Sequence, residues 1–216
     1  MKQLVIFDLD GTLLNSIADL GNAANHALEK AGFPTHPAEA YPRFVGNGVR
    51  RLIERVLPES HRSRETVNRL LVDFKEYYND HLTDETRPYP GIPELLRDLT
   101  DRGIKVAVAS NKYKGAVEVL IRHYFPEIPW AAIEGQKEGI PVKPDPSVVF
   151  EILAEVPTPK SGVLYVGDSG VDMETARRAC VESCGVTWGF RSRQELQENY
   201  AAHIVDTPSQ LLRLAL

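Results

Sequence analysis

The sequence has little cysteine, with Cys180 and Cys184 as its two representatives in 216 residues. That number is too small for a disulfide scaffold, and a zinc site would need ligands from other parts of the chain. We expect both cysteines to be reduced, partly buried thiols. The fold should therefore depend on an apolar core, which a chain of this length can build without covalent or metal support.

Long apolar runs are also missing. No stretch approaches the roughly 20 apolar residues that a membrane-spanning helix needs. The first apolar run, residues 4–7, is followed at once by Asp8 and Asp10, so it is too short for the apolar part of an export signal. We therefore expect no membrane association and a cytoplasmic location.

An excess of positive charge is absent as well. The chain carries 25 Lys and Arg against 30 Asp and Glu, for a formal net charge of −5. Nucleic acids and anionic membranes bind basic surfaces, so neither is expected as a main partner. If this acidic chain binds an anionic small molecule, it must concentrate positive charge locally.

The chain does contain several short, nearly continuous apolar stretches that alternate with helical patterns. Residues 3–9, 105–110 and 163–167 are rich in Val, Ile, Leu and Ala, as buried parallel strands are. This alternation predicts an α/β fold with a doubly wound, mostly parallel sheet covered by helices on both faces. The other expected elements are helices at 92–102, 113–124, 145–155 and 170–179, and short strands near 186–188 and 204–205, with a short apolar piece at 131–133.

Residues 15–85 have a different pattern, with helical spacing of apolar residues and little strand character. We therefore predict two domains. Residues 1–14 and 86–216 would form an α/β catalytic core, and residues 15–85 would form an all-α cap inserted after the first strand. The two connections would act as hinges.

Pairs of acidic residues follow two of the predicted strands. Asp8 and Asp10 lie two residues apart and could face the same crevice, while Asp168 ends a strand and Asp172 falls in the first turn of the next helix. Adjacent carboxylates repel each other unless a cation or a proton intervenes. Mg²⁺ takes such oxygen ligands together with water and phosphate. Helix capping and loop structure are the alternative explanation for these acids.

Polar residues also follow the strand at 105–110 and precede the helix expected at 145. Ser110 and Asn111 could bind a phosphate oxygen or cap the next helix. Asp145 and Pro146 are typical of an N-cap and a first helical residue. Lys143 could be a solvated surface residue or the local positive charge that an anionic substrate needs.

Taken in chain order, these clusters resemble the motifs of the haloacid dehalogenase superfamily, and the resemblance covers nearly the whole chain. Residues 44–52, 88–91 and 185–189 look like the phosphoglycolate phosphatase branch. Asn15 departs from the Asp that such proteins often carry just past the first motif. The motifs are Asp8-Leu9-Asp10-Gly11-Thr12-Leu13, Ser110-Asn111, Lys143-Pro144-Asp145-Pro146 and Gly167-Asp168-Ser169-Gly170-Val171-Asp172.

The resemblance implies roles for the individual residues. Asp8 would be the nucleophile that accepts the phosphoryl group, and Asp10 would serve first as general acid and then as general base. An acid at position 10 is typical of the phosphatases and mutases of the superfamily. Mg²⁺ would be held by Asp8, the backbone carbonyl of Asp10 and Asp168, with Asp172 in an outer position. The phosphate ligands would be Thr12, Ser110, Asn111 and Lys143.

We therefore expect a Mg²⁺-dependent phosphatase of a small phosphorylated metabolite, with 2-phosphoglycolate as the first candidate. The alternatives are a phosphomutase similar to β-phosphoglucomutase, a phosphatase of a nucleotide or pyrophosphate, and a non-catalytic binding module. Arg50 and Arg51 either reach a substrate carboxylate or are solvated. The chain is expected to be a monomer or a homodimer.

Overall fold

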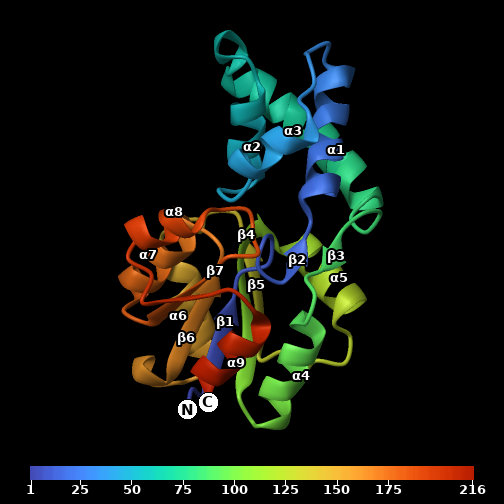
Figure 1. The fold of residues 1–216 in the computed structure, drawn as a ribbon. Coiled ribbons are helices and arrows are strands. Elements are labelled where there is room, and N and C mark those ends of the chain that lie inside the picture. Colours follow the sequence, from blue (N-terminus) through green and yellow to red (C-terminus); the bar gives the residue numbers. More distant parts are fainter.

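A six-stranded parallel sheet forms the centre of the computed structural model, which describes residues 1–216 (Figure 1). The spatial order is β5-β4-β1-β6-β7-β8, and every adjacent pair is parallel. The predicted doubly wound α/β class is confirmed. The strands are β1 (Leu4–Phe7), β4 (Lys105–Tyr113), β5 (Ala132–Gln136), β6 (Val163–Gly167), β7 (Glu182–Val186) and β8 (His203–Val205).

Helices cover both faces of the sheet because its strands are apolar on both sides. In β1, Val5 and Phe7 pack into one apolar cluster while Leu4 and Ile6 pack into another, and all four are fully buried. One face is covered by α4 (Ile92–Asp101), α5 (Lys114–Tyr124) and α9 (Pro208–Ala215). The other face is covered by α6 (Ser147–Glu155) and α7 (Gly170–Ala179), with α8 (Arg193–Glu198) against α7 and β7.

Residues 15–85 form a helical segment that lies beyond the carboxyl end of β1, at the top of Figure 1. Short 3₁₀ turns connect its helices. Small and apolar residues such as Ala24 and Phe74 are fully buried where α1 and α3 pack together. The elements are α1 (Ile17–Lys30), α2 (Val49–Val56), α3 (Arg64–Asp80) and the 3₁₀ turns Ala38–Arg43 and Glu59–His61.

The two connections to this segment run side by side. Strand β2 (Leu14–Asn15) leaves the sheet and pairs antiparallel with β3 (Arg87–Pro88), which returns to it. The carboxylate of Asp19, buried at the start of α1, accepts hydrogen bonds from the backbone of Glu85 and from the backbone and hydroxyl of Thr86. Because these contacts join the first connection to the second, the two are held together.

Two predicted boundaries were wrong. The strand expected at 186–188 lies earlier, because its centre uses small residues such as Ser183 and Gly185 that carry little apolar signal. The helix expected from Asp145 begins at Ser147, two residues later. The Asp145 side chain still accepts a 3.0 Å bond from the Ser147 amide, which fits the structural capping role predicted for it. No helix in the structure is long and apolar enough to cross a membrane.

Candidate active site

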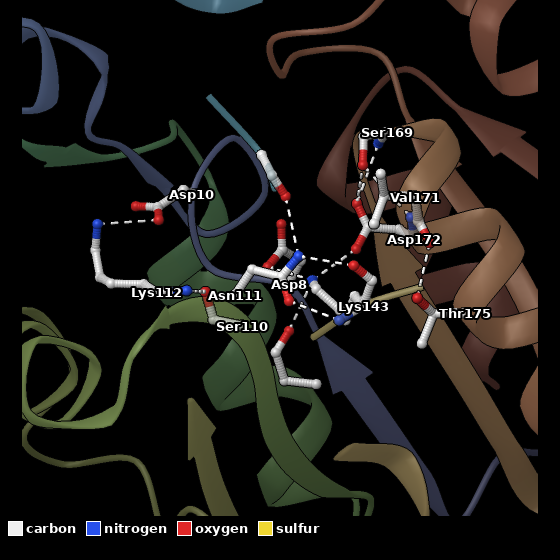
Figure 2. Close-up of polar contacts among 12 residues, drawn as sticks. Asp8, Asp10, Ser110, Asn111, Lys112, Lys143, Ser169, Val171, Asp172 and Thr175 are labelled. Atoms are coloured by element: carbon white, nitrogen blue, oxygen red, sulfur yellow. Dashed lines mark hydrogen bonds and ion pairs between the residues drawn. The ribbon is translucent and has the colours of Figure 1, made fainter. Parts of the chain in front are cut away.

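Asp8 is the first residue after β1, at the carboxyl edge of the sheet. Its backbone N–H donates to the carbonyl of Val166 at 2.8 Å, so the position of its side chain is set by the central strands. The side chain is buried, and its Oδ1 accepts a 2.7 Å hydrogen bond from Lys143 Nζ. Figure 2 shows Asp8, Lys143 and Asp172 pointing toward one another.

Lys143 is buried and uses all three of its ammonium hydrogens within the protein. It donates to Asp8 at 2.7 Å, to Asp172 at 2.8 Å and to the carbonyl of Ala109 at 3.0 Å. Burial opposes the charge on Lys143, but Asp172 and Asp8 raise its pKa well above the usual range. Lys143 is therefore a fixed positive charge that holds two carboxylates in place.

The carboxylates of Asp8, Asp168 and Asp172 converge, with one oxygen of each within 4.8 Å of the others. Burial and repulsion from Asp172 raise the pKa of Asp8 to about 7, although Lys143 opposes the shift. Burial and its acidic neighbours also raise the pKa of Asp168 well above the usual range. The site is therefore short of positive charge, and hard oxygen donors in this arrangement fit a divalent cation such as Mg²⁺.

Asp168 is held between two glycines. Its Oδ2 accepts a 2.6 Å hydrogen bond from the Phe190 amide. A Cβ atom on Gly11 would overlap the Asp168 carboxylate, and one on Gly189 would overlap its Cβ. Gly11 also has a φ of +90°, which a residue with a side chain rarely adopts. The turn after β1 therefore approaches Asp168 closely because glycine occupies position 11.

Asp172 has a structural role beside its place in the acidic cluster. It is the third residue of α7, and its Oδ2 accepts bonds from the Ser169 hydroxyl at 2.6 Å and the Ser169 amide at 3.2 Å. Ser169 accepts in turn from the Asp172 amide, so the pair forms a capping box. The other oxygen of Asp172 binds Lys143. The capping explanation for Asp172 is therefore confirmed, and the same carboxylate also lies in the acidic cluster.

Asp10 faces a different lysine. Its Oδ1 accepts a 2.5 Å hydrogen bond from the Ser16 hydroxyl, and its Oδ2 lies 3.0 Å from Lys112 Nζ. Lys112 also donates to the Tyr78 hydroxyl of α3 at 2.8 Å. Lys112 was not among the site residues predicted from the sequence. Its place two residues after Ser110 on the same strand was the available signal, because such residues face the same side.

A pocket lies between the carboxyl end of the sheet and the helical segment. Its sheet side presents Asp8, Asp10, Ser110 and Lys112. The opposite wall is apolar and comes from α1, α2, α3 and the loop before α2. These apolar residues are Leu20, Val45, Val49, Leu52 and Phe74.

Two of the residues expected to bind phosphate have other surroundings. The side chain of Thr12 is fully buried outside this pocket, and its hydroxyl has no hydrogen-bond partner. The Asn111 amide nitrogen donates to the carbonyls of Gly46 and Lys143, both at 3.1 Å, and its oxygen accepts from the Lys143 amide at 2.8 Å. Ser110 and Asn111 both line the pocket, but the side-chain amide of Asn111 already has these protein partners. The expectation of direct phosphate contact therefore fits Ser110 better than Thr12 or Asn111.

Arg50 and Arg51 do not face the pocket. Arg50 donates to Asn68 at 2.7 Å and Arg51 donates to Glu54 at 2.7 Å, both on the exposed side of the helical segment. Neither arginine lines the pocket beside Asp8. The structure thus favours the solvated alternative for both.

Comparison with known proteins shows which family has this sequence pattern. The model of the haloacid dehalogenase-like hydrolases matches residues 5–186, which include every cluster described above. The chain belongs to the haloacid dehalogenase-like hydrolase family. The predicted superfamily is thereby confirmed, and the hydrolase is an enzyme of the phosphatase type.

Relatives of the hydrolase match it from end to end. A phosphoglycolate phosphatase of Mesorhizobium japonicum is 31% identical, over 99% of this chain and 98% of the relative. One of Aquifex aeolicus is 31% identical, over 98% of this chain and 96% of the relative. The crystal structure of a candidate phosphoglycolate phosphatase from Lactobacillus delbrueckii subsp. bulgaricus superposes with a TM-score of 0.94 and 36% identity, covering 100% of this chain and 99% of that one.

Proposed function

We propose that this hydrolase is a Mg²⁺-dependent phosphatase that removes the phosphoryl group of a small phosphomonoester through an aspartyl-phosphate at Asp8. One observation supports this proposal most strongly. Asp8 lies at the floor of a pocket, bound to Lys143 at 2.7 Å and clustered with Asp168 and Asp172. A buried carboxylate with a fixed cation on one side and an acidic cluster beside it suits nucleophilic attack on phosphorus.

The residues around Asp8 fit a divalent cation. Asp8, Asp168 and Asp172 offer carboxylate oxygens that lie within 4.8 Å of one another. Asp8 and Asp168 would bind the ion, the backbone carbonyl of Asp10 would be a third ligand as the family resemblance implies, and Asp172 would lie in an outer position. When bound, Mg²⁺ supplies positive charge that offsets the repulsion between the nucleophile and the phosphate dianion.

Asp8 and Asp10 would perform the bond-making steps. An oxygen of Asp8 attacks phosphorus while the bond from phosphorus to the ester oxygen breaks, and Asp10 gives its proton to the departing oxygen. Asp10 then takes a proton from water, which attacks phosphorus and releases inorganic phosphate and free Asp8. Asp10 suits both steps because it also lines the pocket.

Charge on the transferring phosphoryl oxygens must be stabilised in the transition state. Ser110 can donate its hydroxyl hydrogen, because that group otherwise only accepts a 3.2 Å bond from the Lys112 amide. Lys143 contributes its charge from behind Asp8. Asn111 would act indirectly, since its amide holds the Lys143 backbone.

Residues 15–85 would act as a cap over the core formed by residues 1–14 and 86–216. The apolar wall of the pocket comes from this segment, so its approach would exclude water from the reacting groups. The paired connections β2 and β3 would serve as the hinge. Arg191 of the core donates to the carbonyls of Pro42 and Val45, the latter at 2.7 Å, and so holds the segment against the core in the structure described.

2-Phosphoglycolate is the first substrate to test, because several full-length relatives are named for it. Phosphate release should be measured over a panel of phosphorylated metabolites, including nucleotides and pyrophosphate, with Mg²⁺ and with EDTA. The proposal expects release that EDTA abolishes and that Asp8→Asn reduces to background. Activity that survives either change would contradict it. A mutase would instead release little phosphate and would require a bisphosphate activator.

A further inference from the structure

Lys112 is a buried cation whose ammonium group has fewer hydrogen-bond acceptors in the protein than it has hydrogens. Its side chain is 4% exposed. Its one hydrogen-bond acceptor is the Tyr78 hydroxyl at 2.8 Å, and its one ion-pair partner is Asp10 at 3.0 Å. An ammonium group has three hydrogens, so at least one is left for a further acceptor. A buried ammonium group with an unpaired N–H is costly in free energy unless a ligand accepts that hydrogen bond.

The surroundings of Lys112 limit what that acceptor can be. Lys112 is the one cationic residue that lines the pocket, and the wall opposite it is apolar. Lys143, the other lysine of the site, has already used its three hydrogens. An anionic group that enters this pocket on the leaving-group side would therefore have Lys112 as its available charged partner.

We propose that Lys112 is a specificity-determining residue that binds an anionic group, such as a carboxylate, on the leaving group of the substrate. This inference depends on the proposed function, in which Asp10 protonates the ester oxygen. Because Lys112 Nζ lies 3.0 Å from Asp10, a substrate group bound to Lys112 must lie close to the ester oxygen that Asp10 protonates. The substrate class would be short phosphomonoesters that carry a negative charge one or two carbons from the ester oxygen.

Tyr78 links this recognition to the helical segment. It belongs to α3, it is fully buried, and its ring lies 4.8 Å from the Lys112 ammonium. Burial raises the pKa of Tyr78 well above the usual range, so its hydroxyl remains neutral and can accept the hydrogen bond from Lys112. The Lys112 ammonium group is thus positioned at the pocket by Tyr78 from the helical segment and by Asp10 from the sheet side.

The test compares two esters of equal length, 2-phosphoglycolate and 2-hydroxyethyl phosphate, which differ in the charge of the leaving group. We expect the wild type to prefer 2-phosphoglycolate in kcat/KM. Lys112→Met should reduce that preference by roughly 10- to 100-fold, the range for losing a hydrogen bond to a charged group. Lys112→Arg should keep much of it. Lys112→Gln serves as a second uncharged variant if the Met variant does not fold.

Equal losses on both esters would overturn the inference, because Lys112 would then act only through Asp10. An unchanged preference in Lys112→Met, or a wild type without a preference, would overturn it too. Lys114→Met is the matched control: Lys114 pairs with Glu134 outside the pocket, and Lys137 still pairs with Glu134 when it is replaced. Asp8→Asn separates the two proposals, because its inactivity on both esters supports the proposed function whatever the preference is.

Discussion

Lys143 Nζ and Asp8 Oδ1 lie 2.7 Å apart although 135 positions separate the two residues in the chain. The lysine also binds Asp172 at 2.8 Å, so a single buried ammonium group joins the nucleophile candidate to the start of α7. Any change at Lys143 should therefore affect both the stability of the fold and the reactivity of Asp8.

Replacing Lys143 by Met leaves Asp8 and Asp172 buried without their shared cation. We expect the free energy of unfolding to fall by about 3–5 kcal/mol, as it does when one partner of other buried ion pairs is removed. Phosphatase activity should fall to background. Urea unfolding and phosphate release measure the two effects. The partly exposed Lys137 pairs with Glu134 and Glu151, so Lys137→Met should cost about 1 kcal/mol or less. Comparable stability of the two variants would show that the Lys143 contacts matter little.

Replacing Gly11 by Ala should disable the site without unfolding the protein. The new Cβ would overlap the Asp168 carboxylate and must displace it, and misplacement of about 1 Å can cost roughly 100-fold in rate. Gly32→Ala is the control, because Gly32 has a similar positive φ of +77° but open space around it. That variant should lose about 1 kcal/mol of stability and keep its activity. Full activity in Gly11→Ala would refute the close approach of the turn to Asp168.

In the metal-free protein, the stability contributed by protonated Asp8 should be lost as the pH rises from about 4 to about 7. Burial raises the pKa of Asp8 from 3.8 to about 7, so in this range the folded state binds a proton that the unfolded state has lost. The contribution of Asp8 to stability is therefore largest below its pKa in the unfolded state and is lost as the pH rises through its pKa in the folded state. Asp168 shifts in the same direction.

Mg²⁺ should therefore raise the melting temperature more at about pH 8 than at about pH 5, because it must compete with protons for these carboxylates at low pH. Melting curves with EDTA and with Mg²⁺ at both pH values provide the measurement. Asp168→Asn should weaken the dependence on Mg²⁺. An equal Mg²⁺ effect at both pH values would argue against binding by Asp8 and Asp168.

Asn111→Ala should reduce kcat by about 10-fold or more, because the amide of Asn111 holds the backbone of Lys143 on both sides. KM for the substrate should change less: although Asn111 lines the pocket, its side-chain amide is already hydrogen-bonded to the backbone of Gly46 and Lys143. Steady-state kinetics separate the two parameters. A large rise in KM with kcat unchanged would instead indicate that Asn111 binds the substrate directly.

Thr12→Val should leave activity and stability nearly unchanged or slightly improve stability. The Thr12 hydroxyl is buried without a partner, and a methyl group of similar shape removes that cost. The backbone carbonyl of Thr12, which accepts a 3.0 Å bond from Trp188, is unaffected. Loss of phosphate release in this variant would show that the hydroxyl does contact phosphate, as the sequence had suggested.

Some features of the site followed from local rules. The position of Asp8 after an apolar strand predicted its place at the carboxyl edge of a parallel sheet, because such strands end at the same edge. Asp172 followed from the electropositive first turn of a helix. Lys112 was harder to recognise, because its spacing from Ser110 on the same strand was the one local signal for it. An isolated lysine is usually solvated, and nothing in its neighbourhood along the chain shows that Tyr78 and Asp10 bury it.

The sequence by itself determined the α/β class, the helical character of residues 15–85 and the acids at the strand ends, because periodicity and residue type are local properties of the chain. Only the tertiary structure decided how the donors are used. In the folded protein, the three ammonium hydrogens of Lys143 bind protein groups, and the side-chain amide of Asn111 is hydrogen-bonded to backbone groups. Lys112, by contrast, lines the pocket. The physical reason is that hydrogen bonds are directional and short, so their partners depend on which distant segments the packing brings together.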